Sequence, residues 1–251
     1  MKQIDLNCDL GESYGKFSSD HDAGIMPFIS SCNIAAGFHS GDPHSISRTI
    51  QLALKNKVAI GAHPSFPDLQ GFGRRVMHLS KGELISCVQY QVAAVKGMTE
   101  AVGGTLHHVK PHGALYNYAS KDKDTAVAIA EALAEWLPGV KLYAPWKSAL
   151  ADAALEMNME VAFESFADRK YEDDRSLRSR QKEGAVLSND IEVLDQVDLL
   201  TSENKVITFT GAEIDMKTDT ICLHSDTKGA LELAGKIYNH LKEHGVHVRP
   251  V

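Results

Sequence analysis

Short apolar segments alternate with longer amphipathic segments along most of the chain. Seven segments are brief, rich in Val, Ile and Leu, and lack strict polar alternation: residues 3–8, 31–36, 58–62, 105–109, 141–144, 159–163 and 220–223. Apolar strands of this kind are typical of parallel sheets that are covered on both faces. We therefore predict a parallel β-sheet built from seven strands.

Capping signals mark the amphipathic segments as helices. Ser and Asp side chains accept hydrogen bonds from the free N–H groups of a first helical turn, and Pro suits that turn. The predicted starts are Asp42, Ser80, Ser120 or Asp122, and Asp226, and the helices run to about residues 57, 102, 137 and 244. Glycine or proline follows three of these ends, as expected where a helix stops.

The regular succession of strand and helix predicts a closed or nearly closed barrel. Strand–helix alternation requires parallel strands, and a single α/β barrel commonly has 200–250 residues. We therefore expect a single-domain, seven-stranded (β/α) barrel over residues 1–251. Residues 206–210 and 213–216 interrupt the alternation and predict a small β excursion. Thirteen of the fifteen residues in 168–182 are polar or charged, so we expect a long mobile loop there.

Composition narrows the class of protein. The chain is 43% hydrophobic and 24% charged, with a formal net charge of −7, which argues against binding to nucleic acid or to an anionic membrane. Its four cysteines are widely spaced and form no Cys-x-x-Cys pair, and the first residues lack the apolar core of a signal peptide. We expect a cytoplasmic protein with reduced thiols.

Polar side chains that can take part in catalysis follow nearly every predicted strand. They are Asp5, Asn7, Asp9 and Glu12 after the first strand, Asn33, His39 and Asp42 after the second, His63, Asp68, Arg74 and Arg75 after the third, Lys110, His112, Tyr116 and Asn117 after the fourth, Glu164, Asp168 and Arg169 after the sixth, and His224 and Asp226 after the last. The carboxyl ends of barrel strands meet at one face, where barrel enzymes have their active sites. We therefore predict an enzyme.

Some of these residues have a structural interpretation as well. Asp42 is a helix N-cap, Asp5 is placed to point into the barrel and fix it by hydrogen bonds, and Asn33 can hold backbone instead of substrate. His107 and His108 are adjacent in a strand, so they face opposite ways, and at least one is expected to be structural.

Two kinds of chemistry remain open on this face. Asp or His can act as a general base on water while Lys110 and Arg74 or Arg75 hold anionic groups. Alternatively, a metal ion held by Asp9, His39 and His63 would acidify a bound water. The chain has no Gly-x-Ser-x-Gly or His-Glu-x-x-His motif, and residues 11–17 fall short of a phosphate-binding loop, so we expect no ATP site of the P-loop kind.

Six segments of the chain resemble the signature blocks of the LamB/YcsF family. They read DLNCDLGE, NIAAGFHSGDP, GAHPSFPDLQGFGRR, HVKPHGALYN, FADRKY and the late His-x-Asp, and they occur in order from Asp5 to Asp226. Two positions depart from the family pattern. Ala36 stands where the family usually has Cys, which argues against a nucleophile there, and His224-Ser-Asp226 replaces the usual His-Gly-Asp-x-Pro.

The resemblance implies a fold and an activity. The fold is a barrel similar to the glycoside hydrolase/deacetylase type, and the activity is hydrolysis of 5-oxo-L-proline to L-glutamate coupled to hydrolysis of ATP, with Mg²⁺ expected. It also implies a complex with two other subunits, B and C, and leaves open which subunit binds ATP. In our hypothesis Asp9 or His63 activates water, Lys110 neutralises developing phosphate charge, and an Arg holds the substrate carboxylate.

On that basis the candidate residues take roles. The catalytic set is Asp9, His39, His63, Lys110 and His112. The substrate-binding set is Asn7, Glu12, Asn33, Arg74, Arg75, Tyr116, Asp168, Arg169, His224 and Asp226. Two alternatives remain: a divalent-metal-dependent carbohydrate deacetylase or other amidohydrolase, and a non-catalytic subunit that only binds substrate or ATP. Metal analysis after chelation separates the first from the ATP-dependent reaction, and turnover that is insensitive to these residues would favour the second.

Overall fold

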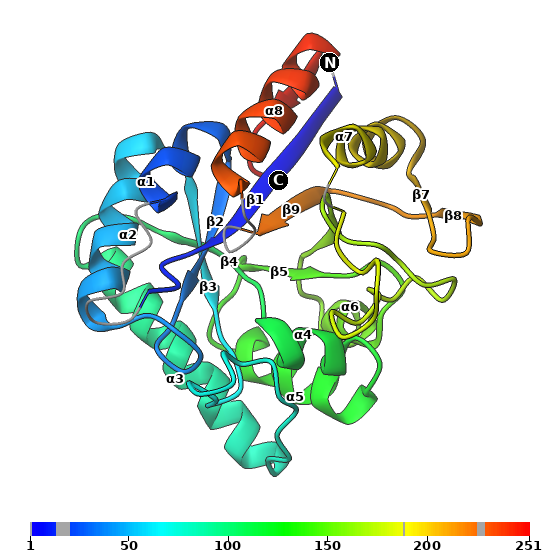
Figure 1. Ribbon diagram of the computed structural model, residues 1–251. Helices are drawn as coiled ribbons and strands as arrows, with labels where there is room; N and C mark the ends of the chain where they lie inside the picture. The colour runs from blue at the N-terminus through cyan, green and yellow to red at the C-terminus, as the bar shows by residue number, and fades with distance from the viewer. Residues whose placement is uncertain (1, 14–20, 188, 225–228) are drawn as a thin grey trace.

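Seven parallel strands of the described chain form a closed barrel (Figure 1). The computed structural model describes residues 2–13, 21–187, 189–224 and 229–251. The barrel strands are β1 (Lys2–Leu10), β2 (Ser31–Ala35), β3 (Ala59–His63), β4 (Leu106–Val109), β5 (Lys141–Ala144), β6 (Val161–Phe166) and β9 (Thr220–His224). The barrel is closed because β9 pairs with both β1 and β6. The seven predicted strands and the barrel are confirmed.

Helices surround the strands on the outside, as Figure 1 shows. They are α1 (His21–Ile25), α2 (Pro43–Asn56), α3 (Lys81–Glu100), α4 (Gly113–Ala119), α5 (Lys123–Ala134), α6 (Ala149–Glu156), α7 (Asp190–Asp198) and α8 (Ala230–Glu243), with a 3-10 turn at Met26–Phe28 and a π turn at Leu199–Glu203. None of the helices in this part of the chain is both long and apolar enough to cross a lipid bilayer.

Two of the predicted helix starts are confirmed without change. Asp42 and Ser80 each form a capping box with the third residue of the helix that follows. Ser120 does not start a helix: its hydroxyl donates to the Tyr116 carbonyl and ends α4, whereas Asp122 caps α5. The last helix begins at Ala230, later than the start expected at Asp226, which lies outside the described residues.

Two smaller β elements lie beside the barrel. β7 (Lys205–Ile207) and β8 (Glu213–Asp215) form the antiparallel excursion that the sequence predicts. β10 (Val246–Val248) pairs in parallel with the first residues of β1 and adds an eighth strand that the sequence pattern does not predict. Residues 168–182 are irregular, and isolated bridges join Arg169 to Val186 and Tyr171 to Leu177.

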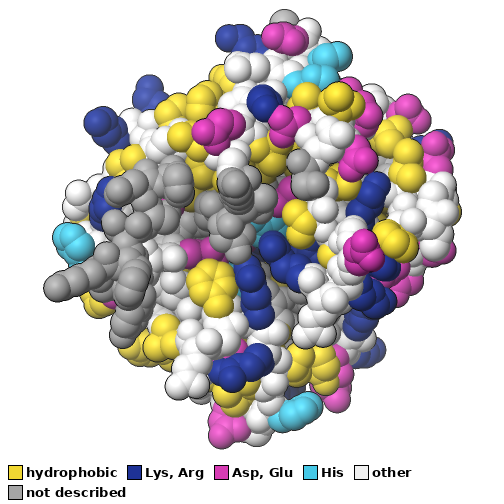
Figure 2. Space-filling model, viewed as in Figure 1, with side chains coloured by type: hydrophobic (Ala, Val, Ile, Leu, Met, Phe, Trp, Pro, Cys, Tyr) yellow, Lys and Arg dark blue, Asp and Glu magenta, His cyan; other side chains and the backbone are white. Residues whose placement is uncertain are grey.

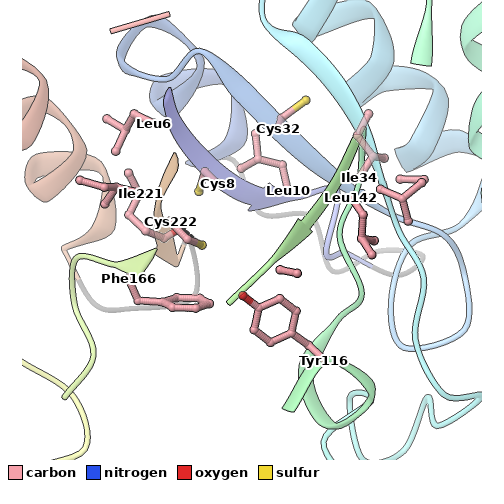
Figure 3. Packing of buried hydrophobic residues seen from close by; sticks show 14 of the residues in the cluster. Leu6, Cys8, Leu10, Cys32, Ile34, Tyr116, Leu142, Phe166, Ile221 and Cys222 are labelled. Carbon is pink, nitrogen blue, oxygen red and sulfur yellow. Dashed lines mark hydrogen bonds between the residues drawn. The ribbon is translucent and has the colours of Figure 1, made fainter. Parts of the chain in front are cut away.

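The side chains of β1 divide between two environments. Leu6, Cys8 and Leu10 belong to the buried hydrophobic cluster beneath the helices, part of which Figure 3 shows. Asp5 and its alternate neighbours along the strand bond to side chains of other strands across the barrel axis. The interior of the barrel is therefore polar, and the apolar core lies between the strands and the helices.

Candidate active site

A carboxylate surrounded by hydroxyls fills the amino-terminal layer of the barrel. Asp5 is fully buried and accepts hydrogen bonds from Ser30, Ser31, Tyr143 and Thr220 at 2.6–2.9 Å. Burial raises the pKa of Asp5, although these four bonds act against the rise. The structural role predicted for Asp5 is confirmed.

Amide side chains form the next layer. The Asn33 amide nitrogen donates to Asn7 and to Asp9, each at 2.7 Å. The Asn33 oxygen lies 2.7 Å from Nε2 of His108, which is buried in the barrel, whereas His107 bonds to the carbonyl of Val251. The two histidines face opposite ways, as expected. Asn33 holds side chains of this network instead of backbone.

Lys110 is the cationic centre of the barrel. Its ammonium lies 2.9 Å from carboxylate oxygens of Asp9 and Glu164, and also 2.9 Å from the sulfur of Cys222. The residue is 2% exposed. Burial alone would lower the pKa of Lys110, but the surrounding charges, led by Asp9, raise it well above its ordinary value. Lys110 is therefore a fixed positive charge.

Asp9 connects this centre to a group of imidazoles. One carboxylate oxygen bonds Lys110 and Asn33, and the other lies 3.3 Å from Nε2 of His63. Burial would raise the pKa of Asp9, but the charges of His63 and Lys110 lower it well below its ordinary value. Asp9 is thus an ionised carboxylate in a buried site.

The histidine tautomers follow from the carbonyl groups that the rings contact. Nδ1 of His63 lies 2.6 Å from the carbonyl of Lys110, and Nε2 of His112 lies 2.9 Å from the carbonyl of Phe72. A carbonyl oxygen only accepts, so these two nitrogens carry the hydrogens. The opposite nitrogens, Nε2 of His63 and Nδ1 of His112, face each other at 3.0 Å.

Glu12 and His39 complete the group. Oε1 of Glu12 lies 3.2 Å from Nε2 of His39 and 3.4 Å from Nδ1 of His112. The His39 ring stacks on that of His112 at 3.8 Å between centroids. Burial, followed by neighbouring imidazoles, lowers the pKa of both His39 and His112 well below the ordinary value. These two rings are therefore neutral.

Open hydrogen-bonding capacity lies on the other side of Lys110. Tyr116 of α4 and Phe166 of β6 meet edge to face, and Figure 3 shows Cys222 of β9 beside them. Three buried side-chain atoms of the described residues have no hydrogen-bond partner, namely Tyr116 Oη, Glu164 Oε2 and His39 Nδ1. Unsatisfied buried polar atoms are rare, and at a barrel mouth they indicate where a ligand binds.

Basic side chains gather near the centre of the same face, as Figure 2 shows. Nδ1 of His224 lies 2.9 Å from Asp168 at the end of β9. Arg169 beside this pair donates to the carbonyls of Ala185 and Arg178. Burial, followed by the charge of Arg180, lowers the pKa of Arg169 to about 10. Two guanidinium groups so close together favour an anionic ligand.

The two predicted arginines after β3 differ in position. Arg75 forms an ion pair with Asp68, and its side chain is 63% exposed. Arg74 places its guanidinium 5.0 Å from the centre of the Phe72 ring. Phe72 also packs against His112, so Arg74 borders the imidazole group, while Arg75 is held at the surface.

Most of the predicted site residues therefore lie at one face of the barrel. Arg75 is turned away from it, and Asp226 lies outside the described residues. Sequence reasoning gives no role to Glu164 or Cys222, although both contact Lys110. The predicted strand ends at residue 163, which leaves Glu164 in a loop. β6 instead continues to Phe166 and carries Glu164 into the barrel.

The fold and the site together define a barrel of the enzyme type, with charged groups and imidazoles at the carboxyl ends of its strands. The chain belongs to the LamB/YcsF family, whose model matches residues 4–251.

Two curated relatives carry the name of the A component of 5-oxoprolinase. The protein from Bacillus cereus (strain B4264) is 45% identical, over 99% of this chain and 98% of its own length. The protein from Tolumonas auensis is 46% identical, over 99% of each chain. A crystal structure of the lactam utilization protein from Thermus thermophilus is 40% identical and has a TM-score of 0.94, over 99% of this chain and 100% of that one. The predicted family membership is confirmed, and the relatives support a hydrolase component within a larger complex.

Proposed function

We propose that this chain is the barrel subunit of an ATP-dependent 5-oxoprolinase, which acts with two other subunits to hydrolyse 5-oxo-L-proline to L-glutamate. The observation that carries the proposal is the buried Asp9–Lys110–Glu164 group beside unpartnered polar atoms. The names of the two curated relatives and of the lactam utilization protein agree with a lactam substrate.

ATP is needed because a five-membered lactam is a stable amide. Transfer of the γ-phosphoryl group of ATP, as its Mg²⁺ complex, to the lactam oxygen releases ADP and makes the ring carbon electrophilic. Water then adds to that carbon, the ring C–N bond breaks as the nitrogen takes a proton, and a second water releases phosphate. Negative charge gathers on the former carbonyl oxygen during these steps.

The residues of the site match these needs. Lys110, held by Asp9 and Glu164, provides a preorganised positive charge for the oxygen, and such a group contributes roughly 10²–10³ in kcat. Asp9 or His63 accepts the proton of the attacking water. Arg74 and Arg169 border the site and suit the substrate carboxylate or a phosphate.

The test is release of glutamate from 5-oxoproline with ATP and Mg²⁺. The purified chain is assayed alone and with both partner subunits, and ATP or this chain is omitted in turn. We expect glutamate only from the full mixture, and a matched Asp9→Asn variant that still joins the complex should lose at least about 100-fold in rate. Absence of glutamate from a complex shown to be folded and assembled would contradict the proposal.

A further inference from the structure

We propose that Glu12, His39, His63 and His112 form a binding site for a divalent transition-metal ion of the zinc type. Four atoms, one from each residue, lie within 4.8 Å of one another. They come from four successive strand–loop units, after β1, after β2, at the end of β3 and after β4. The proposal does not depend on the reaction proposed above.

The orientation of the rings is the first argument. His63 and His112 each use one nitrogen to donate to a backbone carbonyl, which leaves the lone pair of the other nitrogen directed at its neighbour at 3.0 Å. Two lone pairs at this distance repel unless a cation lies between them. Imidazoles that bind metal commonly donate their other N–H to a carbonyl or carboxylate, as these two do.

The spacing of the donor atoms is the second argument. Zinc binds imidazole nitrogen and carboxylate oxygen at about 2.0–2.2 Å, so neighbouring donors of a tetrahedral site lie about 3.4 Å apart. The measured separations are 3.2 and 3.4 Å from Glu12 Oε1 to His39 and His112, and 3.0 Å between His112 and His63. Three imidazoles and one carboxylate suit zinc better than magnesium or calcium, which prefer oxygen.

Two other groups of potential ligands are weaker candidates. Asp9, Cys222 and His224 also lie close together, but the ammonium of Lys110 contacts both Asp9 and Cys222 and would repel a cation. Asp198, His240 and His244 lie at the surface, where Asp198 already pairs with His240. The proposed site is almost wholly buried, and His39 keeps an unpartnered nitrogen there.

A bound ion would supply Lewis-acid chemistry beside Asp9. The alternative occupant is a single proton shared by His63 and His112. The two are distinguished by measuring binding directly in the purified full-length chain, without ATP, 5-oxoproline or partner subunits. The outcome is therefore separate from that of the glutamate assay.

The experiment uses chain that has been stripped with a chelator and dialysed. Zn²⁺ binding is followed by calorimetry, and Co²⁺ binding by its visible absorption, which is most intense for tetrahedral coordination. We expect one ion per chain, and a loss of affinity of at least about 100-fold in His39→Ala. Glu12→Gln, which keeps the shape of the side chain, should also bind more weakly and covers the case in which His39→Ala does not fold.

The matched control is His244→Ala, which removes the surface group and should bind as the unchanged chain does. Equal binding by the unchanged chain and by folded Glu12→Gln would overturn the proposal. So would absence of both the Zn²⁺ heat and the Co²⁺ spectrum, which would leave a shared proton as the occupant. Binding lost only in His244→Ala would assign the ion to the surface group and would also overturn it.

Discussion

Lys110 shows how a single residue can combine a structural and a chemical role. Its ammonium is buried between two carboxylates that come from β1 and β6, so it joins opposite parts of the barrel. Buried ion pairs contribute little net stability compared with apolar residues, but removing one partner leaves an uncompensated charge. We therefore expect the two roles to fail together.

Lys110→Met tests this expectation, because Met fills a similar volume without the charge. Glutamate release should fall by at least about 100-fold. The free energy of unfolding should fall by about 3–5 kcal/mol, since Asp9 and Glu164 lose their common partner. Urea unfolding measures the second effect. Adding Glu164→Gln should restore part of the stability without restoring activity, and a double variant no more stable than Lys110→Met would contradict the account.

At the scale of elements, the strands are more predictable from the sequence than the helices. Buried parallel strands leave an unbroken apolar pattern, and that pattern locates all seven strands of the barrel. It misses α4 (Gly113–Ala119), because seven residues show too little periodicity and the N-cap, His112, makes no capping bond with its side chain. His112 instead turns its ring toward the site.

Close packing between β3 and β4 depends on one glycine. The register of the two strands shifts between Ile60 and Gly61, and the buried ring of His108 occupies the space beside Gly61. A Cβ added at Gly61 would lie 2.1 Å from Nε2 of His108. The ring cannot withdraw without breaking its bond to Asn33, which in turn holds Asp9.

Gly61→Ala should therefore destabilise the protein by about 3 kcal/mol and reduce glutamate release through the displacement of Asn33. Gly97→Ala in α3 is the matched control: nothing lies within 4 Å of the added methyl group, and alanine favours the helix by about 1 kcal/mol. Thermal unfolding of both variants provides the comparison. A Gly61→Ala protein as stable as the control would refute the packing argument.

For the whole molecule, the sequence predicts which face carries the site but not which residues meet there. Each candidate follows a strand, and the barrel brings strand ends together whatever the sequence between them. Contacts such as Lys110 with Cys222, or Asp9 with His63, join positions far apart in the chain. They depend on strand order and side-chain direction, which no local pattern contains. The pairing of β10 with β1 is hidden for the same reason.

Closure of the barrel should also depend on pH. Asp168, after β6, pairs with His224 at the end of β9, the strand that closes the barrel, and Arg169 and Arg180 lie nearby. Burial raises the pKa of Asp168, but His224 and then the arginines lower it below the ordinary value. A carboxyl whose pKa is lowered by folding stabilises the protein above its unfolded pKa of about 3.9, and this stabilisation is lost as the pH falls through the folded value.

Stability measured by urea unfolding should therefore fall between about pH 6 and about pH 3. In Asp168→Asn, which keeps the size and an acceptor oxygen, the fall should be smaller and the stability near neutral pH already lower. His247→Ala, at an exposed position of β10, is the control for an unrelated side chain. An identical fall in Asp168→Asn would show that the pair contributes nothing to the acid response.

The order of synthesis gives the distribution of site residues a further meaning. Glu12, His39, His63, Asp9 and Lys110 all precede α4, whereas Glu164 and Cys222 belong to β6 and β9. A chain that leaves the ribosome thus has its imidazoles and Lys110 long before two of the three groups that contact the ammonium. Until β6 and β9 arrive, burial of Lys110 is opposed by its missing partners. The last strands therefore do more than close a cylinder: they set the moment in biosynthesis at which its interior becomes dry.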